Sequence, residues 1–414
     1  MKNLRNVFAI SLLASLLDCQ PAEVTEPVVE ADDQIIIGHI DKLDSAALGE
    51  ERDIWIYVPR GAETPENIAS KYPVVYLLDG NGHFHSVTGM IKQLSTTNGN
   101  TISPQMIVVG IPNTDRFRDL TPTHVEGTSG GGDAFLDFIE HELVPYIEEA
   151  YPVSRYRTFI GHSLGGLMAI DALVTRPHLF DNYVAIDPSL WWDEQAILRK
   201  AEAALIERDF SGKSLYVAVA NTMREGMSLG DVVDNTDEST LHIRSILQFS
   251  ASAAAEQRNG LNFDWKYYDD DNHGSVPLIA EYDAIRFLFP WYQVRGINEL
   301  LSEDSTATPD EVVNHITSHY ANVSEHFAYT VVAPVQFVNR LGHAFLGNEK
   351  PDSAYALFAM NQKNNPDSPI VFDAFGDYYL AQENMEQARE YFSRAVALGG
   401  TTSQEKLDKL AADD

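Results

Sequence analysis

The sequence predicts a doubly wound, mostly parallel α/β sheet followed by a small all-α region. Short apolar runs alternate with helical patterns over residues 34–295, and such alternation implies parallel strands joined by right-handed crossovers. A glycine-flanked serine, Ser163, lies between an apolar run and a helical one. After about Gly296 the strand-like runs stop, and two helical windows repeat with the same spacing.

The overall composition is that of a globular protein. The chain has 414 residues, of which 44% are hydrophobic and 22% charged, so it has ample material for a core. Its formal net charge of −32 repels phosphate backbones and excludes nucleic acid as an expected partner. The simplest interpretation of this charge is a solvated, soluble surface.

Residues 1–19 have the pattern of an export signal, with a basic start, an apolar run and a cysteine. The apolar run Val7–Leu17 is too short to span a bilayer. The segment resembles a bacterial lipoprotein signal, in which lipidated Cys19 would anchor the mature chain to a membrane. Asp18 departs from that pattern, which has a small residue before the cysteine. We expect a periplasmic or envelope-anchored protein, with an ordinary cleaved signal as the alternative to lipidation. Residues 20–33 are acidic and contain proline, which predicts a tether.

Apolar runs predict the strands in chain order. The second run shows period-2 alternation, and the third is continuously apolar, as expected of a strand buried on both faces. The predicted strand segments are 35–40, 53–59, 72–80, 105–113, 157–163, 182–189, 214–221 and a final one from Phe263. Apolar residues at helical spacing also predict a helix over residues 131–151. In such sheets the chemistry collects at the carboxyl ends of the strands.

Residues 296–414 predict helices of the tetratricopeptide type. A helix is expected over Pro309–Phe327, and two windows thirty-four residues apart repeat small and aromatic residues at matching positions. The first window holds Leu341, Gly342, Phe345, Ala354, Phe358 and Pro366, and the second holds Phe375, Gly376, Tyr379, Ala388, Phe392 and Ala395. This tail could offer a groove to a protein partner. The alternative is a helical cap that stabilises the remaining chain or a homodimer contact, because so short an array must bury its faces.

Ser163 has the surroundings of a nucleophile on a sharp strand-to-helix turn. Gly161 and Gly165 relieve crowding on that turn, and Gly166 lets the following helix approach the sheet. Serine needs a histidine base, and on such turns the acid and then the histidine follow the serine along the chain. His273 fits, because it lies in a polar loop directly after the last predicted strand.

The acid that orients the base is less determined. Glu225 is the nearest carboxylate after the strand 214–221, and we favour it because a base-orienting group is normally held near a strand end. Asp187, which follows the preceding strand, is an alternative, as are Asp231, Asp234 and Asp237 further along the loop. A serine–histidine pair without an acid is a further alternative.

Backbone N–H groups are expected to hold the oxyanion. One donor is that of Leu164, directly after the nucleophile, and the other belongs to Asn81 or Gly82 in the loop after the third strand. This chemistry needs no metal and no cofactor.

Five stretches, in this order, resemble the putative-esterase family of α/β-hydrolases, which includes esterase D-like enzymes and siderophore trilactone esterases. They are "VVYLLDGNGHFHSVTGMI", "MIVVGIPNTDRFRDLTPTH", "FIGHSLGGLMAIDAL", "DPSLWW" and "NHGSVPLIAEYDAIRFLF". The resemblance covers about residues 34–290, and some family members also carry a helical-repeat tail. It implies that Ser163 is the nucleophile, His273 the base, and Asn81 or Gly82 with Leu164 the oxyanion hole. It also implies a pocket rim formed by Arg116, Arg118, Trp191 and Trp192.

We therefore expect a serine hydrolase that cleaves carboxylic esters of small molecules through an acyl-enzyme intermediate. One alternative is an acyltransferase that uses the same nucleophile. Another is an envelope interaction protein that works through its helical tail, with the hydrolase domain as a scaffold.

Overall fold

The computed structural model describes residues 34–59, 71–256 and 258–412. The predicted export signal with Cys19 and the predicted tether over residues 20–33 lie outside these described residues. From Ile37 onward the chain forms one compact unit. Within the described residues, no helix is both long enough and apolar enough to cross a membrane.

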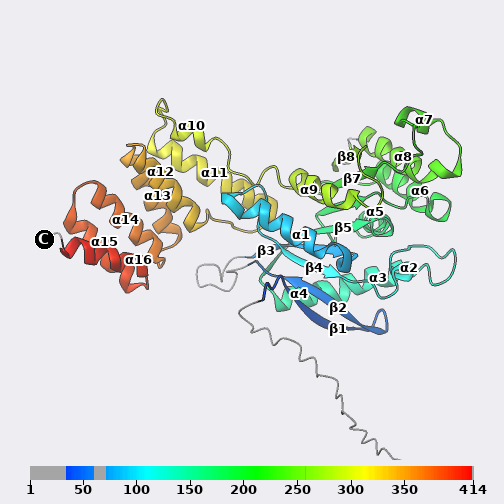
Figure 1. Ribbon diagram of the computed structural model, residues 1–414, viewed down its shortest axis with the longest axis horizontal. Helices are drawn as coiled ribbons and strands as arrows, with labels where there is room; N and C mark the ends of the chain where they lie inside the picture. Colours follow the sequence, from blue (N-terminus) through cyan, green and yellow to red (C-terminus); the bar gives the residue numbers. More distant parts are fainter. Residues whose placement is uncertain (1–33, 60–70, 257, 413–414) are drawn as a thin grey trace, which may run out of the picture. The chain divides into compact units, whose positions relative to one another are not determined.

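An eight-stranded sheet lies at the centre of the fold (Figure 1). Its strands are β1 (His39–Ser45), β2 (Glu50–Tyr57), β3 (Tyr72–Leu78), β4 (Ile107–Ile111), β5 (Val153–His162), β6 (Asn182–Ile186), β7 (Ser214–Ala220) and β8 (Asn262–Tyr268). Across the sheet they run in the order β1-β2-β4-β3-β5-β6-β7-β8. Both pairings of β2 are antiparallel and the other pairings are parallel. The predicted doubly wound, mostly parallel sheet is confirmed.

Burial along the strands follows the sequence patterns. Every residue of β3, β4 and β6 is buried, as their continuous apolar runs predict. The first strand departs from the prediction, because it begins at His39 and not at Ile35. Ile35 and Ile36 are instead 93% and 61% exposed. The polar segment HIDKLDS forms the strand because it pairs with β2 along its whole length at the edge of the sheet.

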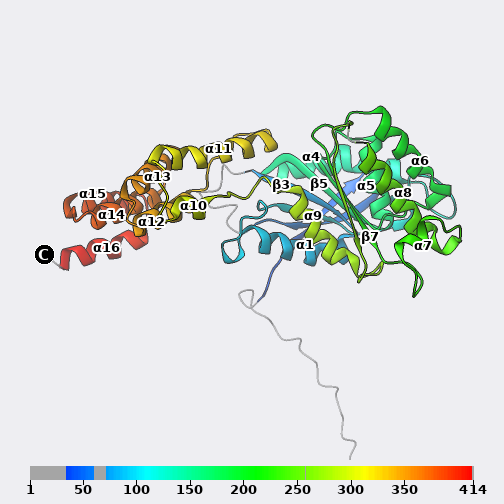
Figure 2. The ribbon, with the colours of Figure 1, turned by 90° about the horizontal axis from the view of Figure 1, so that it is seen from above.

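Helices cover both faces of the sheet (Figure 2). The helices up to residue 288 are α1 (Gly80–Ser95), α2 (Arg116–Asp119), α3 (Gly132–Phe138), α4 (Val144–Ala150), α5 (Leu164–Thr175), α6 (Trp192–Glu207), α7 (Leu229–Val233), α8 (Leu241–Ala255) and α9 (Val276–Leu288). One hydrophobic core joins the sheet to α1 and α9. A second and larger core joins the opposite face to α3, α4, α5, α6 and α8.

The helix predicted over residues 131–151 is present as one continuous helical stretch. A π-helical segment at Ile139–Leu143 joins α3 to α4 without a break. Most of the predicted apolar positions are buried in the larger core, and Tyr146 is half-buried against it; the buried ones are Phe135, Leu136, Phe138, Ile139 and Leu143. This stretch therefore packs on the sheet through the stripe that its sequence predicts.

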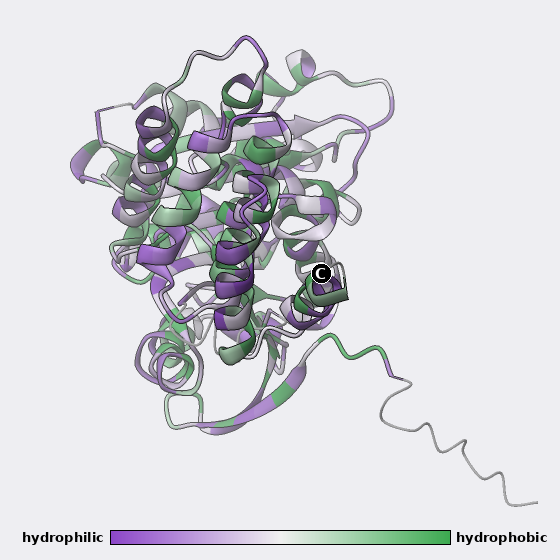
Figure 3. Cartoon of the chain, turned by 90° about the vertical axis from the view of Figure 1, so that its left-hand side faces the viewer, coloured by the Kyte–Doolittle hydropathy of each residue, from purple (hydrophilic) through white to green (hydrophobic). Residues whose placement is uncertain are grey.

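Between residues 297 and 412 the chain is helical apart from its connections. The helices are α10 (Ile297–Leu301), α11 (Pro309–Phe327), α12 (Val335–Gly347), α13 (Pro351–Asn364), α14 (Pro369–Ala381), α15 (Met385–Ala397) and α16 (Thr401–Ala412). Hydrophilic and hydrophobic residues mix along these helices (Figure 3), as expected of amphipathic helices that pack on one side.

Two glycines allow the helices of the tail to pair closely. A Cβ on Gly342 of α12 would collide with the Phe358 ring of α13, and one on Gly376 of α14 would collide with the Phe392 ring of α15. These are the small and aromatic positions that repeat in the sequence. The helical region itself is confirmed, and its assignment to the tetratricopeptide type stays a prediction.

Candidate active site

Ser163 lies on a strained turn between β5 and α5. Its backbone has φ 61° and ψ −114°, a conformation that costs free energy for a non-glycine residue and is typical of functional turns. A Cβ on Gly161 would collide with the Gly165 carbonyl, so the turn can close only with glycine there. The Ser163 N–H donates to the Ile186 carbonyl at 2.9 Å, which ties the turn to β6. The predicted nucleophile-type turn therefore has the expected shape.

Each of three neighbouring strands is followed directly by a residue with positive φ. Asp79 (φ 52°) follows β3, Ser163 follows β5, and Asp187 (φ 43°) follows β6. These strands are adjacent and parallel in the sheet, so their carboxyl ends lie at one edge. Strained residues collect where chemistry occurs, and this edge is therefore the candidate active site.

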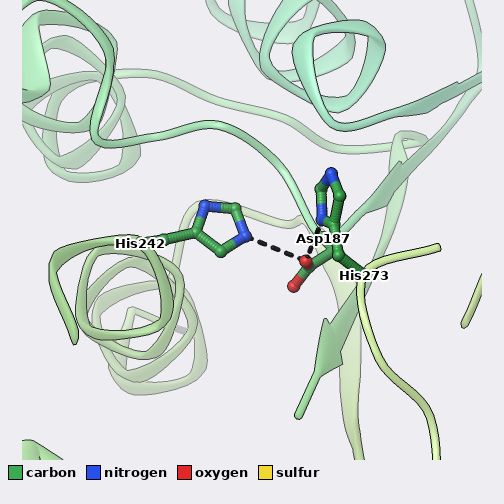
Figure 4. Close-up of side chains that lie close together, drawn as sticks. All are labelled: Asp187, His242 and His273. Carbon is green, nitrogen blue, oxygen red and sulfur yellow. Dashed lines mark hydrogen bonds and ion pairs between the residues drawn. The ribbon is translucent and has the colours of Figure 1, made fainter. Parts of the chain in front are cut away.

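His273 is held by a buried carboxylate. Its Nδ1 lies 2.5 Å from Asp187 Oδ2 (Figure 4), and the Asp187 side chain is fully buried. The other oxygen, Oδ1, accepts from the Ala220 N–H at 3.0 Å. Burial alone would raise the pKa of Asp187, but the hydrogen bonds from His242, His273 and Ala220 hold that pKa well below its usual range. Asp187 is therefore ionised and able to orient His273.

The structure does not bring Glu225 to His273. Glu225 is exposed in the loop after β7, and it makes no hydrogen bond or ion pair within the described residues. Asp187 directly follows β6, and its side chain contacts His273. The alternative weighed from the sequence is the carboxylate that contacts His273.

Ser163 and His273 line the same cavity. Its volume is about 370 Å³, and its lining consists of Asp79, Asn81, Gly82, His83, Asn113, Arg116, His162, Ser163 and His273. The Ser163 hydroxyl lies 3.2 Å from the hydroxyl of Ser189. A hydroxyl rotates freely, and contacts between nucleophile and base often tighten only when substrate binds. The arrangement can thus present Ser163 and His273 to one bound ester.

Two backbone N–H groups are available to an oxyanion. In the described part of the chain, neither the Asn81 N–H nor the Leu164 N–H donates a hydrogen bond to a protein acceptor. The Gly82 N–H, in contrast, donates to the Asp79 carbonyl at 2.8 Å. Of the two alternatives predicted after the third strand, Asn81 is thus the better placed to serve as a donor alongside Leu164.

Arg116 and Asp79 form a bidentate pair beside the cavity. Arg116 Nε donates to Asp79 Oδ1 at 2.6 Å and Nη2 to Oδ2 at 3.0 Å, while Asn113 Nδ2 also donates to Oδ1 at 2.6 Å. Burial would raise the pKa of Asp79, but these donors lower it. Asp79 is the N-cap residue of α1, whose first turn carries Asn81, so the pair holds the start of that helix. The sequence did not single out Asp79.

The other predicted rim residues lie elsewhere. Arg118 is paired with Glu50 at 2.7 Å and with Asp119 at 2.7 Å. Trp192 is 4% exposed and packs edge-on against Phe117, so it is a core residue. Trp191 is 40% exposed and does not line the cavity. Of the four candidates, only Arg116 reaches the cavity.

Two further histidines extend the site. His83 Nδ1 lies 3.3 Å from Glu281 Oε1; this contact raises the pKa of His83 although burial opposes it. Burial raises the pKa of Glu281, which is 1% exposed. The His162 ring lies 4.5 Å from the His273 ring and 5.9 Å from the His83 ring. Burial, with His273 and His83 nearby, lowers the pKa of His162 to about 4.

The low pKa of His162 predicts a loss of stability on mild acidification. As the pH falls below about 6.5, the unfolded chain binds a proton at this position before the folded chain does, so stability falls until about pH 4. Between pH 7.5 and 5.0 this group alone removes about 2 kcal/mol. A His162→Phe variant keeps a ring there and should lose about 2 kcal/mol less than the wild type over that interval.

Urea unfolding at both pH values, followed by tryptophan fluorescence, measures this difference. All five tryptophans lie at or before residue 291, so the signal reports the part of the chain that carries the site. If both proteins lose the same free energy of unfolding between pH 7.5 and 5.0, His162 is not the group responsible for the pH dependence.

Comparison with known proteins places the chain among ester hydrolases. The family described as "Putative esterase" matches residues 45–267. Ferri-bacillibactin esterase BesA of Bacillus subtilis is 32% identical over 258 residues, covering 58% of this chain and 85% of the relative. The siderophore enterobactin esterase of Emericella nidulans is 31% identical over 252 residues, covering 52% of this chain and 81% of the relative. An IroE-like serine hydrolase structure from Shewanella oneidensis has a TM-score of 0.65 and 32% identity, covering 79% of this chain and 99% of the other.

Proposed function

Because the chain belongs to the putative esterase family and is an ester hydrolase, we propose that Ser163, His273 and Asp187 are its nucleophile, base and acid. The observation that carries this proposal is the 2.5 Å contact between His273 and the buried Asp187, beside the strained turn of Ser163. The shared cavity supports it further, because both Ser163 and His273 line it.

The reaction follows from these positions. Ser163 Oγ attacks the ester carbonyl while His273 Nε2 takes its proton, and Asp187 stabilises the resulting imidazolium through Nδ1. The N–H groups of Asn81 and Leu164 hold the oxyanion. His273 then protonates the leaving alcohol, which departs and leaves Ser163 acylated. Water then attacks the acyl group while His273 takes its proton. The carboxylic acid product leaves, and the proton on His273 returns to Ser163 Oγ.

Siderophore esters are the substrate class that we propose. The named relatives act on bacillibactin and enterobactin. Two nitrogen donors, those of Arg116 and His83, line the cavity and can donate to the electron-rich oxygen atoms of such an ester. Arg116 binds Asp79 through Nε and Nη2, whereas its Nη1 makes no hydrogen bond to the residues that the structure describes.

Comparing substrates tests this proposal. We expect kcat/KM for enterobactin or bacillibactin, measured by chromatography of the products, to exceed that for short-chain nitrophenyl esters by about a hundredfold or more, equivalent to about 2.7 kcal/mol of differential transition-state binding. Short-chain, aromatic and simple lactone esters complete the panel. A preference for any simple ester over both siderophores would contradict the assignment.

We also propose that residues 1–19 direct export, with Cys19 as an anchor on the periplasmic side of a membrane. The support is the basic, apolar and cysteine order of this segment. Fractionation of cells that express the wild type and Cys19→Ala tests it, because loss of the membrane-bound fraction in the variant is expected. Equal distribution of the two proteins would contradict anchoring through Cys19.

A further inference from the structure

A second histidine contacts the acid of the proposed triad. His242 Nε2 lies 2.8 Å from Asp187 Oδ2, the same oxygen that accepts from His273 Nδ1 at 2.5 Å (Figure 4). His242 is the second residue of α8, and its side chain is 20% exposed. The two rings meet edge to face, with their centroids 5.4 Å apart. The steps of ester hydrolysis described above make no use of His242.

The short distances identify these contacts as hydrogen bonds. The three side chains could in principle hold a metal ion, because their ligand atoms lie within 4.8 Å of one another. Ligand atoms bound to one tetrahedral zinc ion at about 2.0–2.1 Å would, however, lie about 3.3 Å apart. The observed separations of 2.8 and 2.5 Å are shorter, so a proton lies on each line.

The direction of the His242 bond is also determined. An ionised carboxylate only accepts, so His242 donates through Nε2. Its Nδ1 is buried and has no hydrogen-bond partner among the described residues. The His242 ring therefore donates one hydrogen bond, to Asp187, and its other nitrogen makes none to the described residues.

We propose that His242 is a positioning residue, which holds the Asp187 carboxylate in the orientation that His273 requires. This inference rests on the proposed triad, since His242 acts through Asp187. The Ala220 N–H, on β7, binds Oδ1, and His242, on α8, binds Oδ2 beside His273. Because β7 binds one carboxylate oxygen and α8 binds the other, the Asp187 carboxylate cannot rotate about its Cβ–Cγ bond without breaking a charge-assisted hydrogen bond.

Two amide variants separate positioning from packing. The Nε2 of glutamine reaches the place of the histidine Nε2, whereas the shorter asparagine places its amide too far away to donate to Asp187. We expect His242→Asn to lower kcat about 10- to 100-fold with KM changed less than about threefold. His242→Gln should stay within about fivefold of the wild-type kcat. Should the Asn variant fail to fold, His242→Met fills the space without donating and takes its place, with the same expected loss.

The same substitution in an Asp187→Asn background completes the test. There, His242→Asn should change the remaining kcat by less than about twofold, because the carboxylate that it positions is already gone. His141→Phe, on an exposed histidine of the α3–α4 stretch, is the control and should leave kcat unchanged.

Equal losses in the Gln and Asn variants, or an equal effect of His242→Asn in both backgrounds, would overturn the inference. Full activity of His242→Asn together with an inactive Asp187→Asn would overturn the role of His242 while leaving the triad intact. Full activity of Asp187→Asn would overturn both.

Discussion

Replacing Ser163 by alanine is expected to lower kcat for ester hydrolysis by about 10⁴- to 10⁶-fold, because no other group can form the acyl-enzyme. Alanine can occupy the same backbone position, so the fold and substrate binding should be kept. Steady-state hydrolysis of the preferred ester measures kcat and KM, and tryptophan fluorescence checks folding.

A second serine variant controls for the loss of a serine hydroxyl as such. Ser103 is fully buried, and its hydroxyl has no partner among the described residues, so Ser103→Ala should leave turnover within about twofold of the wild type. A Ser163→Ala protein that keeps more than about a tenth of the wild-type kcat would contradict the role of Ser163 as nucleophile.

Replacing Asp187 by asparagine is expected to lower kcat by about 10²- to 10⁴-fold. A neutral amide neither stabilises the imidazolium nor accepts from both histidines, which now donate to Asp187 Oδ2 at 2.5 and 2.8 Å. Because residue 187 is fully buried, water cannot take the place of the lost carboxylate oxygen beside His273. Steady-state kcat measures the loss of activity, and the unfolding midpoint of the same protein shows whether the variant is still folded.

Glu225 provides the matched control for this second prediction. Glu225→Gln makes the same change from carboxylate to amide at an exposed position, so its kcat should stay within about twofold of the wild type. A larger loss in Glu225→Gln than in Asp187→Asn would show that Glu225 is the acid after all.

The fold was predictable because its strands are either continuously apolar or regularly alternating. The runs that became β3, β4 and β6 are buried along their whole length, and such segments leave few alternatives to a central parallel sheet. The first strand was misplaced because an edge strand needs no apolar run. The polar residues from His39 form it through their pairing with β2, and pairing is a property of two segments together.

The site was predictable where it depends on strand ends. Ser163 and His273 each follow a predicted strand, and the structure brings both to one cavity. The sequence left the acid open because both Asp187 and Glu225 follow strands, and a single sequence does not state which loop lies beside the histidine. One signal did favour Asp187: it comes directly after its strand, whereas Glu225 comes five residues after the end of β7.

Other parts of the site had no signal in the sequence. His242 lies in a helical pattern, far along the chain from Asp187 and His273, and only the packing of α8 brings it to them. Arg118 and Trp192 belong to motifs near the site, yet an ion-pair network and the core take up their side chains. Motifs identify which loops surround a site, whereas the direction of each side chain depends on its neighbours in space.

Covalent labelling tests the role of Ser163 most directly. A fluorophosphonate reacts with an activated serine, and peptide mass spectrometry of the labelled protein locates the adduct. We predict one adduct in the wild type, on Ser163, and none in Ser163→Ala at the same reagent concentration. An adduct on another residue, or labelling of Ser163→Ala equal to that of the wild type, would contradict the proposal that Ser163 is the nucleophile.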